Sequence, residues 1–171
     1  MGRITLITGG TRSGKSAHAL ELAQQAGPRR AYVATLEASD DAEMRERIAR
    51  HKSERPPDFA TIEEPVNIAS ALEALRADVV IIDSLTLWVA NLMRICSGED
   101  AIRHEARTLA HVMEQAQFDS IVVTDEVGSG IVPDNAVARR YRDLLGLANQ
   151  RIARSATEVL LMVSGIPLKV K

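Results

Sequence analysis

The sequence predicts one α/β domain, with a mostly parallel central sheet and helices on both of its faces. Strand-like and helix-like segments alternate along all 171 residues. The apolar run Val79–Ile82 is of the kind that a strand buried on both faces requires. A glycine-rich turn links the first strand, Arg3–Thr8, directly to a helix. Because no repeat, low-complexity tract or linker interrupts this pattern, we expect a single domain over residues 1–171.

The first helix is expected to end near Ala26, where Gly27-Pro28 provides a glycine cap and then a residue that cannot continue the helix. Ala31–Thr35 is the second expected strand. The next helix begins at Ser39–Asp41 and ends before Arg55–Pro57. It has acidic residues in its first turn and basic residues near its end, as the helix dipole favours.

The second half of the chain continues the alternation. Ile68–Leu75 has the apolar spacing of a helix and precedes the strand Val79–Ile82. The remaining expected elements are a long amphipathic helix from about Ala101 to Ala116, a strand over Ser120–Thr124, a helix over Asn135–Ala153, a strand over Val159–Val163 and a short edge strand over Leu168–Val170.

The composition argues against several classes of protein. Apolar residues make up 46% and charged residues 26%, as in ordinary globular domains. The formal charge of −2 gives no basic field for nucleic acid, and aromatic residues, at 3%, are scarce for a base-stacking protein. Cys96 is the only cysteine, so no intrachain disulfide can form. No apolar run approaches the ~20 residues of a membrane span, and the early first strand leaves no room for a signal peptide, so we expect a cytoplasmic protein.

The turn after the first strand fits the pattern G-x-x-x-x-G-K-[ST], in the strand–turn–helix context that this pattern requires. Its residues are Gly9, Gly10, Thr11, Arg12, Ser13, Gly14, Lys15 and Ser16. The glycines let backbone N–H groups point at phosphate oxygens, and the helix N-terminus adds partial positive charge. Lys15 would reach the β- and γ-phosphates, and the Ser16 hydroxyl would hold Mg²⁺. The sequence therefore predicts a site for a nucleoside triphosphate with magnesium.

Acidic residues follow two of the expected buried strands. Asp83 ends the run Val79–Ile82, at the sheet edge where P-loop enzymes place a second magnesium ligand. The alternative is that Asp83 caps the helix that begins near Ser84, and one residue can serve both purposes. Asp125 and Glu126 end the next such strand at the same edge, where they either serve the site or form a solvated loop pair.

His51 has two interpretations. It lies seven residues after Met44 and three after Ile48, so it shares a helix face with them. It is then a core residue, or a cation at a helix C-terminus that the dipole favours. Alternatively, its imidazole attacks a phosphoryl group, while nearby basic residues steady the phosphates and keep the ring neutral and nucleophilic. Those basic residues are Arg47, Arg50, Lys52 and Arg55.

The other histidines lie on expected helices with ordinary amphipathic surroundings, and we interpret them as surface or helix-face residues. They are His18, His104 and His111. No pair of histidines has metal-ligand spacing supported by cysteine, which argues against zinc. The basic cluster Arg139, Arg140 and Arg142 is either a solvated helix face or a contact for a phosphate-rich substrate or another subunit.

Segments along nearly the whole chain match one enzyme family. The stretch Glu126–Gln150 is the most specific of them, and the P-loop is far less specific. The others are Tyr32–Thr35, Asp41–Met44, Arg47-Ile48, His51-Lys52, Arg55-Pro56, Thr61, Glu63, Asp83–Trp88, Asn91-Leu92, Asn149–Arg151 and Val163–Gly165. On these segments the chain resembles the bifunctional adenosylcobinamide kinase / adenosylcobinamide-phosphate guanylyltransferases of cobalamin biosynthesis.

The resemblance implies a RecA-like P-loop fold and two reactions. The kinase step would move the γ-phosphate of ATP or GTP to the aminopropanol hydroxyl of adenosylcobinamide. The second step would move GMP from GTP to that phosphate, giving adenosylcobinamide-GDP and pyrophosphate, through a histidine that carries GMP covalently. The matching residue is His51, so the resemblance favours the nucleophile. Enzymes of this family form trimers with active sites at subunit contacts, which implies a homotrimer here.

The resemblance also implies nucleotide contacts beyond the P-loop. The predicted further contacts are Ala34, Thr35, Leu36, Lys52, Ser53, Glu54, Arg55, Glu63 and Asp83.

Three residues depart from the family pattern. Arg50 stands where relatives often have a second histidine, which leaves His51 as the candidate for the covalent site. Asp125 stands where asparagine is common, and the added negative charge is expected to alter magnesium or phosphate affinity. Phe59 stands where tryptophan is frequent. None of these departures removes a residue that the chemistry needs.

Two other functions fit parts of the sequence. A monofunctional small-molecule kinase would use Lys15, Ser16 and Asp83 without His51. A nucleotide-gated switch or motor that binds DNA would also carry a P-loop, but the slight negative charge and scarce aromatic residues argue against it. The predicted catalytic residues are therefore Lys15 and His51.

Overall fold

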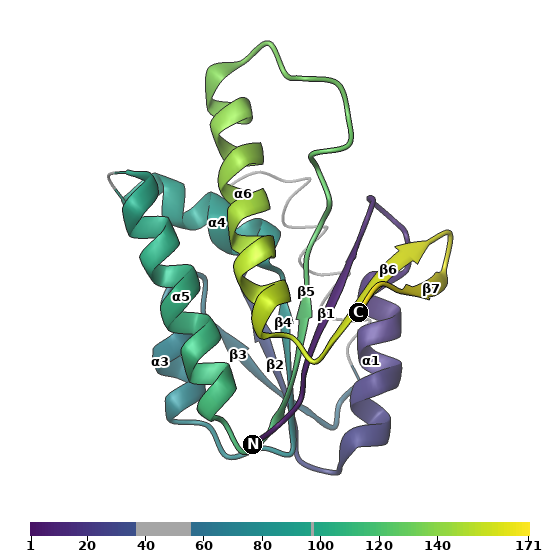
Figure 1. The fold of residues 1–171 in the computed structure, drawn as a ribbon. Helices are drawn as coiled ribbons and strands as arrows, with labels where there is room; N and C mark the ends of the chain where they lie inside the picture. Colours follow the sequence, from purple (N-terminus) through teal and green to yellow (C-terminus); the bar gives the residue numbers. More distant parts are fainter. Residues whose placement is uncertain (37–55, 97) are drawn as a thin grey trace.

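The computed structural model describes residues 1–36, 56–96 and 98–171. Its strands are β1 (Ile4–Gly9), β2 (Arg30–Ala34), β3 (Phe59–Glu63), β4 (Val79–Asp83), β5 (Asp119–Val123), β6 (Glu158–Val163) and β7 (Ile166–Lys169). Within the described residues they form one seven-stranded sheet in the order β3-β2-β4-β5-β1-β6-β7 (Figure 1). Neighbouring strands are parallel except β6 and β7, which are antiparallel. The predicted mostly parallel sheet with a C-terminal edge strand is confirmed.

Helices cover both faces of the sheet, as predicted. The described helices are α1 (Lys15–Ala26), α3 (Ile68–Glu73), α4 (Leu85–Ile95), α5 (Glu99–Gln115) and α6 (Ala136–Ser155). In Figure 1, α1 lies on one side of the sheet and the others lie on the opposite side. The helix predicted to begin at Ser39–Asp41 falls outside the described residues.

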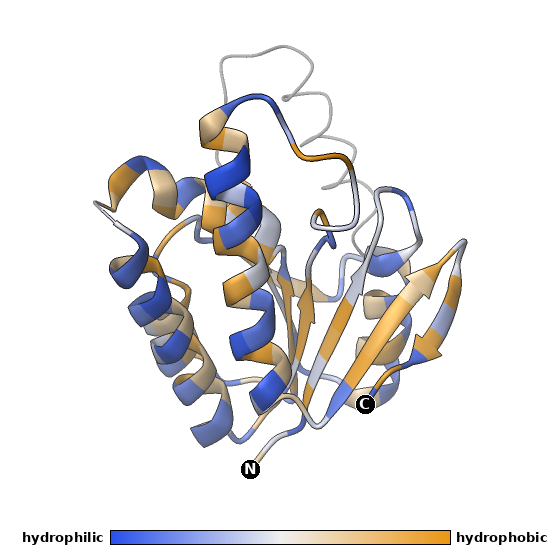
Figure 2. Ribbon diagram, turned by 45° about the horizontal axis from the view of Figure 1, so that its top comes forward, coloured by the Kyte–Doolittle hydropathy of each residue, from blue (hydrophilic) through white to orange (hydrophobic). Residues whose placement is uncertain are grey.

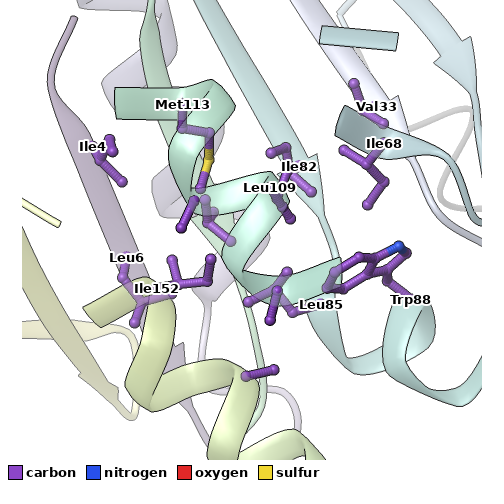
Figure 3. Packing of buried hydrophobic residues seen from close by; sticks show 14 of the residues in the cluster. Ile4, Leu6, Val33, Ile68, Ile82, Leu85, Trp88, Leu109, Met113 and Ile152 are labelled. Carbon is purple, nitrogen blue, oxygen red and sulfur yellow. The ribbon is translucent and has the colours of Figure 1, made fainter. Parts of the chain in front are cut away.

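Alternating side chains of the central strands supply two separate cores. On β4, Val80 and Ile82 pack into the cluster beneath α3, α4, α5 and α6, whereas Val79 and Ile81 pack into the cluster beneath α1. All four are fully buried, which confirms the prediction from their continuous apolar run. Figure 3 shows the larger core, in which Trp88 of α4 lies near Ile68 of α3, and Figure 2 shows the orange, apolar colour of the central strands.

The sequence prediction lacks one strand and most of one helix. The strand β3 was not expected, because this edge strand buries only Phe59 fully and alternates with polar residues such as Thr61. The helix α4 was expected only at its start near Ser84, and it continues to Ile95. Its buried residues are Leu85, Trp88, Val89, Asn91 and Leu92, so a buried asparagine interrupts an otherwise apolar face.

The connection from β5 to α6 extends beyond the carboxyl edge of the sheet (Figure 1). It ends at Asn135, whose side chain accepts hydrogen bonds from the backbone N–H groups of Val137 and Ala138 and thereby caps α6. Arg139 donates to the carbonyl oxygens of Pro133 and Asp134, at 2.9 and 2.7 Å. Part of the basic cluster on α6 therefore holds this connection in place.

Candidate active site

Parallel register brings the predicted site residues to one edge of the sheet. Ala34, the last residue of β2, pairs with Glu63 on β3 and with Asp83 on β4. Asp83 pairs in turn with Val123, so Asp125 comes two residues after the end of β5. The P-loop follows β1 at the same edge, because β1 lies beside β5 in parallel. Ligands of open parallel sheets bind at this carboxyl edge.

The P-loop depends on two glycines. Gly9 has φ of 151°, and a Cβ there would lie 2.6 Å from the carbonyl oxygen of Met162. Gly14 has φ of 94° and forms the N-cap of α1, where no side chain caps the helix among the described residues. The first N–H groups of α1 therefore remain available for phosphate oxygens. The backbone N–H of Gly165 donates to the carbonyl oxygen of Ser13 at 2.9 Å, which ties the loop to the turn between β6 and β7.

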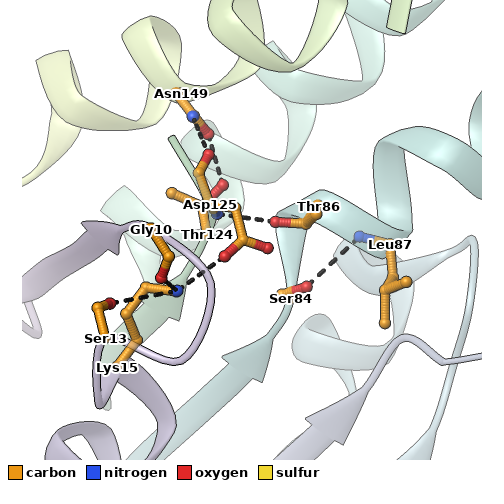
Figure 4. Close-up of polar contacts among 9 residues, drawn as sticks. All are labelled: Gly10, Ser13, Lys15, Ser84, Thr86, Leu87, Thr124, Asp125 and Asn149. Atoms are coloured by element: carbon orange, nitrogen blue, oxygen red, sulfur yellow. Dashed lines mark hydrogen bonds and ion pairs between the residues drawn. The ribbon is translucent and has the colours of Figure 1, made fainter. Parts of the chain in front are cut away.

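Lys15 is buried, with 8% of its surface exposed, and its ammonium group contacts three oxygens (Figure 4). The Nζ atom lies 2.7 Å from Asp125 Oδ1 and donates to the Gly10 carbonyl oxygen at 2.7 Å. It also donates to Ser13 Oγ at 3.5 Å. The structure thus joins Lys15 to one of the two acids predicted at the end of β5, as an ion pair.

A polar network fixes the segment that carries Asp125. Its backbone N–H donates to Thr86 Oγ1 at 2.8 Å, and its carbonyl oxygen accepts from Asn149 Nδ2 at 3.2 Å (Figure 4). Thr124, which is fully buried, donates from Oγ1 to Asn149 Oδ1 at 2.7 Å. Sequence reasoning gave Thr86 and Asn149 no role, because their partners come from distant parts of the chain.

Asp83 accepts a hydrogen bond on Oδ2 from the Tyr32 hydroxyl at 2.6 Å. The adjacent Ser84 is the N-cap of α4, and its Oγ accepts from the backbone N–H of Leu87 at 3.4 Å. The helix-capping alternative considered for Asp83 is therefore wrong, because the next residue does the capping. The carboxylate of Asp83 stays half-buried at the edge of the sheet.

Thr35 joins the ends of β2 and β4. Its hydroxyl donates to the Ser84 carbonyl oxygen at 2.8 Å and accepts from the Ser84 N–H at 2.7 Å. Its backbone carbonyl accepts from Asn91 Nδ2 at 2.8 Å, and its N–H donates to the Asp83 carbonyl oxygen at 3.2 Å. The Thr35 side chain is fully buried. Its predicted nucleotide contact stays a prediction, and the observed contacts position Asp83.

Thr35→Val should destabilise the protein by roughly 1–3 kcal/mol, because it leaves the buried N–H of Ser84 without a partner. The carbonyl of Ser84 retains the N–H of Trp88. Urea unfolding at constant m-value measures the difference. Thr61→Val, which makes the same change at an exposed position on β3, is the control and should stay within about 0.5 kcal/mol of the unmodified protein. Equal stability of the two variants would show that the Thr35 contacts contribute nothing.

Tyr141 of α6 packs over the same network. Its hydroxyl donates to the carbonyl oxygen of Thr86 at 3.0 Å. Burial and, as a smaller contribution, the negative charge of Asp125 together raise the pKa of Tyr141 to about 12. The phenol therefore stays neutral and keeps donating over the whole physiological range.

This shift in pKa predicts how stability depends on pH. The folded state holds the Tyr141 proton more tightly than the unfolded state, whose tyrosines titrate near 10. The stabilisation is fully present below about pH 10 and declines as the pH rises toward about 12. Tyr141→Phe should remove this part of the decline. Subtracting the tyrosinate absorbance of Tyr141→Phe from that of the unmodified protein gives the titration of Tyr141 alone. The midpoint of this titration should lie at about pH 12 in the folded protein and at about pH 10 in urea. A midpoint near 10 in the folded protein would contradict the assignment.

Several other predicted site residues lie outside the residues that the structure describes. His51, Lys52, Ser53, Glu54 and Arg55 fall within residues 37–55, so their placement at the site stays a prediction. Among the remaining histidines, His104 and His111 are exposed and His18 is half-buried with Nδ1 3.3 Å from Glu21 Oε2. Their interpretation as surface or helix-face residues is confirmed.

Comparison with known proteins identifies relatives over nearly the full chain. Residues 5–170 match the family model described as cobinamide kinase / cobinamide phosphate guanyltransferase. The chain is 39% identical to the bifunctional adenosylcobalamin biosynthesis protein CobU of Salmonella typhimurium, covering 97% of this chain and 98% of that protein. It is 38% identical to the corresponding protein CobP of Pseudomonas aeruginosa, covering 97% and 96%. The Escherichia coli protein CobU is 37% identical, with 97% and 98% covered.

Solved structures share the fold at low sequence identity. A KaiC-like protein from Pyrococcus horikoshii superposes with a TM-score of 0.53 at 19% identity, covering 94% of this chain and 70% of that one. The flagellar accessory protein FlaH of Methanocaldococcus jannaschii gives 0.51 at 17% identity, covering 99% and 78%. The predicted α/β fold, with a mostly parallel central sheet and helices on both faces, is confirmed.

Proposed function

This chain belongs to the cobinamide kinase / cobinamide phosphate guanyltransferase family, and from that premise we propose that its P-loop edge serves both of the family's reactions. The chain is a transferase of cobalamin biosynthesis with kinase and guanylyltransferase activities. The observation that carries the site assignment is the convergence of the P-loop, Asp83 and Glu63 at one sheet edge.

In the kinase step, the hydroxyl oxygen of the aminopropanol group of adenosylcobinamide attacks the γ-phosphorus of ATP or GTP. The bond from that phosphorus to the bridging oxygen breaks, the nucleoside diphosphate leaves, and the hydroxyl proton passes to solvent. The N–H groups at the start of α1 and the ammonium of Lys15 stabilise the negative charge on the phosphates. The supporting geometry is a buried lysine at an uncapped helix N-terminus.

In the second step, a ring nitrogen of His51 attacks the α-phosphorus of GTP, and pyrophosphate leaves. A phosphate oxygen of adenosylcobinamide phosphate then attacks the same phosphorus, the P–N bond breaks, and His51 is restored. A phosphoramidate is reactive enough to pass GMP on in this way. The support for His51 is its place in the family resemblance and its basic neighbours in the sequence.

The residues present fit a magnesium ion shared with the nucleotide. Mg²⁺ is usually held by one or two protein oxygens together with phosphates and water, not by an all-protein cage. The described residues contain no group of three or more His, Cys, Asp or Glu side chains arranged to hold a metal. Ser16 and Asp83 are the proposed oxygen ligands, and the ion would neutralise phosphate charge.

We also propose a homotrimer with adenosylcobinamide bound near subunit contacts. Exposed apolar side chains in two places support an assembly: Ile131, Val132 and Val137 beside the β5–α6 connection, and Ile166 and Leu168 on β7. Sedimentation equilibrium tests this proposal through the mass of the particle. Among the helices of the described residues, none combines the length and apolar character needed to cross a bilayer. A cytoplasmic location remains part of the proposal.

Double labelling tests the proposed function as a whole. The purified protein is incubated with adenosylcobinamide and GTP labelled either at the γ- or at the α-phosphate. Label from the γ-position should appear in adenosylcobinamide phosphate, and label from the α-position should appear in adenosylcobinamide-GDP. Transfer of γ-label without any α-label would support the monofunctional kinase instead.

A further inference from the structure

The catalytic lysine of the P-loop already has an anionic partner within the protein. An ammonium group has three N–H donors, and those of Lys15 face Asp125 Oδ1, the Gly10 carbonyl and Ser13 Oγ (Figure 4). The ion pair with Asp125 measures 2.7 Å. These contacts occupy the same donors that β- and γ-phosphate oxygens need.

The ion pair between Lys15 and Asp125 is partly shielded from water. Replacing Asp125 by another anion therefore costs more free energy than it would for an ion pair on the surface. The side chain of Lys15 is 9% exposed and that of Asp125 is 28% exposed. Attraction between charges is stronger where protein replaces water around them. The backbone of Asp125 is held on both sides, by Thr86 Oγ1 at its N–H and by Asn149 at its carbonyl. The carboxylate is therefore presented to Lys15 by a fixed segment.

We propose that Asp125 is an internal competitor of phosphate for Lys15, and that it sets the affinity of this site for nucleotides with β- and γ-phosphates. Binding such a nucleotide requires Lys15 to exchange one anion for another, and the free energy of the lost ion pair is subtracted from that of binding. A nucleoside monophosphate does not reach Lys15 in the P-loop and escapes this penalty. The inference rests on the proposed function only in taking the P-loop as the nucleotide site.

Glu126 offers a contrast at the same edge. It carries the same charge, and it follows Asp125 directly in the chain. Its carboxylate is exposed and accepts from the backbone N–H of Gly128 at 2.9 Å. It therefore contributes general negative charge near the phosphates without holding Lys15. Comparing the two acids separates exchange at Lys15 from simple repulsion.

The experiment measures binding of GTP and GMP by calorimetry to the unmodified full chain and to three variants. Asp125→Asn should bind GTP about tenfold more tightly and change GMP affinity less than about twofold. Glu126→Gln should tighten GTP binding by less than about threefold. Asp119→Asn, at the opposite end of β5 where it pairs with Arg3, controls for net charge and should bind GTP unchanged.

Thermal unfolding gives a second readout. Without nucleotide, Asp125→Asn should melt at a lower temperature, because Lys15 loses its counter-ion. The rise in melting temperature on adding GTP should be larger in this variant than in the unmodified protein.

Two results would overturn the proposal. Weaker GTP binding by Asp125→Asn than by the unmodified protein would mean that the carboxylate stabilises the nucleotide-bound state. If Glu126→Gln tightened GTP binding as much as Asp125→Asn does, simple charge repulsion would explain the gain in affinity. Failure of the proposed function looks different, since the unmodified protein would then bind no GTP.

Discussion

His51→Ala is expected to lower guanylyl transfer by at least about 10³-fold while leaving the kinase step within a few-fold of normal. The reason is that alanine cannot form the phosphoramidate, whereas γ-phosphoryl transfer goes directly from nucleotide to alcohol and needs no covalent carrier. Arg50, in the place of a second histidine, cannot substitute, because a guanidinium stays protonated and is not a nucleophile.

The covalent step can be measured directly. GTP labelled at the α-phosphate is mixed with the protein, the protein is denatured, and retained label is counted before and after mild acid. Acid-labile label should be present on the unmodified chain and on His104→Ala, which changes an exposed histidine of α5, and should be missing from His51→Ala. Label on His51→Ala equal to that on the control would remove His51 from the mechanism.

Lys15→Ala is expected to slow both transfers by roughly 10²–10³-fold, since one loop binds the phosphates in each reaction and a cation facing developing charge contributes on this scale. Lys169→Ala serves as the matched control. Lys169 lies on the edge strand β7 and pairs with Glu158 at 3.0 Å, away from the P-loop, so its loss should leave both rates unchanged. Rates are measured with saturating adenosylcobinamide or adenosylcobinamide phosphate.

Loss of Lys15 also leaves Asp125 without its cation, so structural damage has to be separated from lost phosphate binding. The double variant Lys15→Ala, Asp125→Ala removes both charges. It should recover thermal stability but not activity. Full guanylyl transfer by Lys15→Ala, with the kinase step lost, would mean that the two nucleotides occupy separate sites.

The sequence predicted the fold largely because its signals were local. The continuous apolar run Val79–Ile82 requires a strand whose two faces are both covered by other elements. The spacing of glycines, lysine and serine after β1 matches a single loop geometry. The edge strand β3 escaped prediction because one of its faces is exposed, so it carries no comparable apolar run. Most of the α4 helix was also missed, where the buried Asn91 interrupts the apolar pattern.

The ion-pair and hydrogen-bond partners of the site residues could not be predicted from the sequence. Asp125 was seen as an acid at a sheet edge, yet nothing local distinguishes a loop carboxylate from one that holds Lys15 at 2.7 Å. Likewise, Thr35 was expected to contact nucleotide, and its hydroxyl bonds to Ser84, 49 residues away.

By itself, then, the sequence determined the layered α/β fold, the P-loop and the family, because each depends on patterns within a few neighbouring residues or on segments matched in order. Only the tertiary structure decided which anion faces Lys15, which residue caps α4 and which hydroxyl holds Asp83. These contacts form at the edge of the sheet, where parallel strands from distant parts of the chain end side by side. Buried polar groups there need hydrogen-bond partners, and this need, not local propensity, selects the contacts.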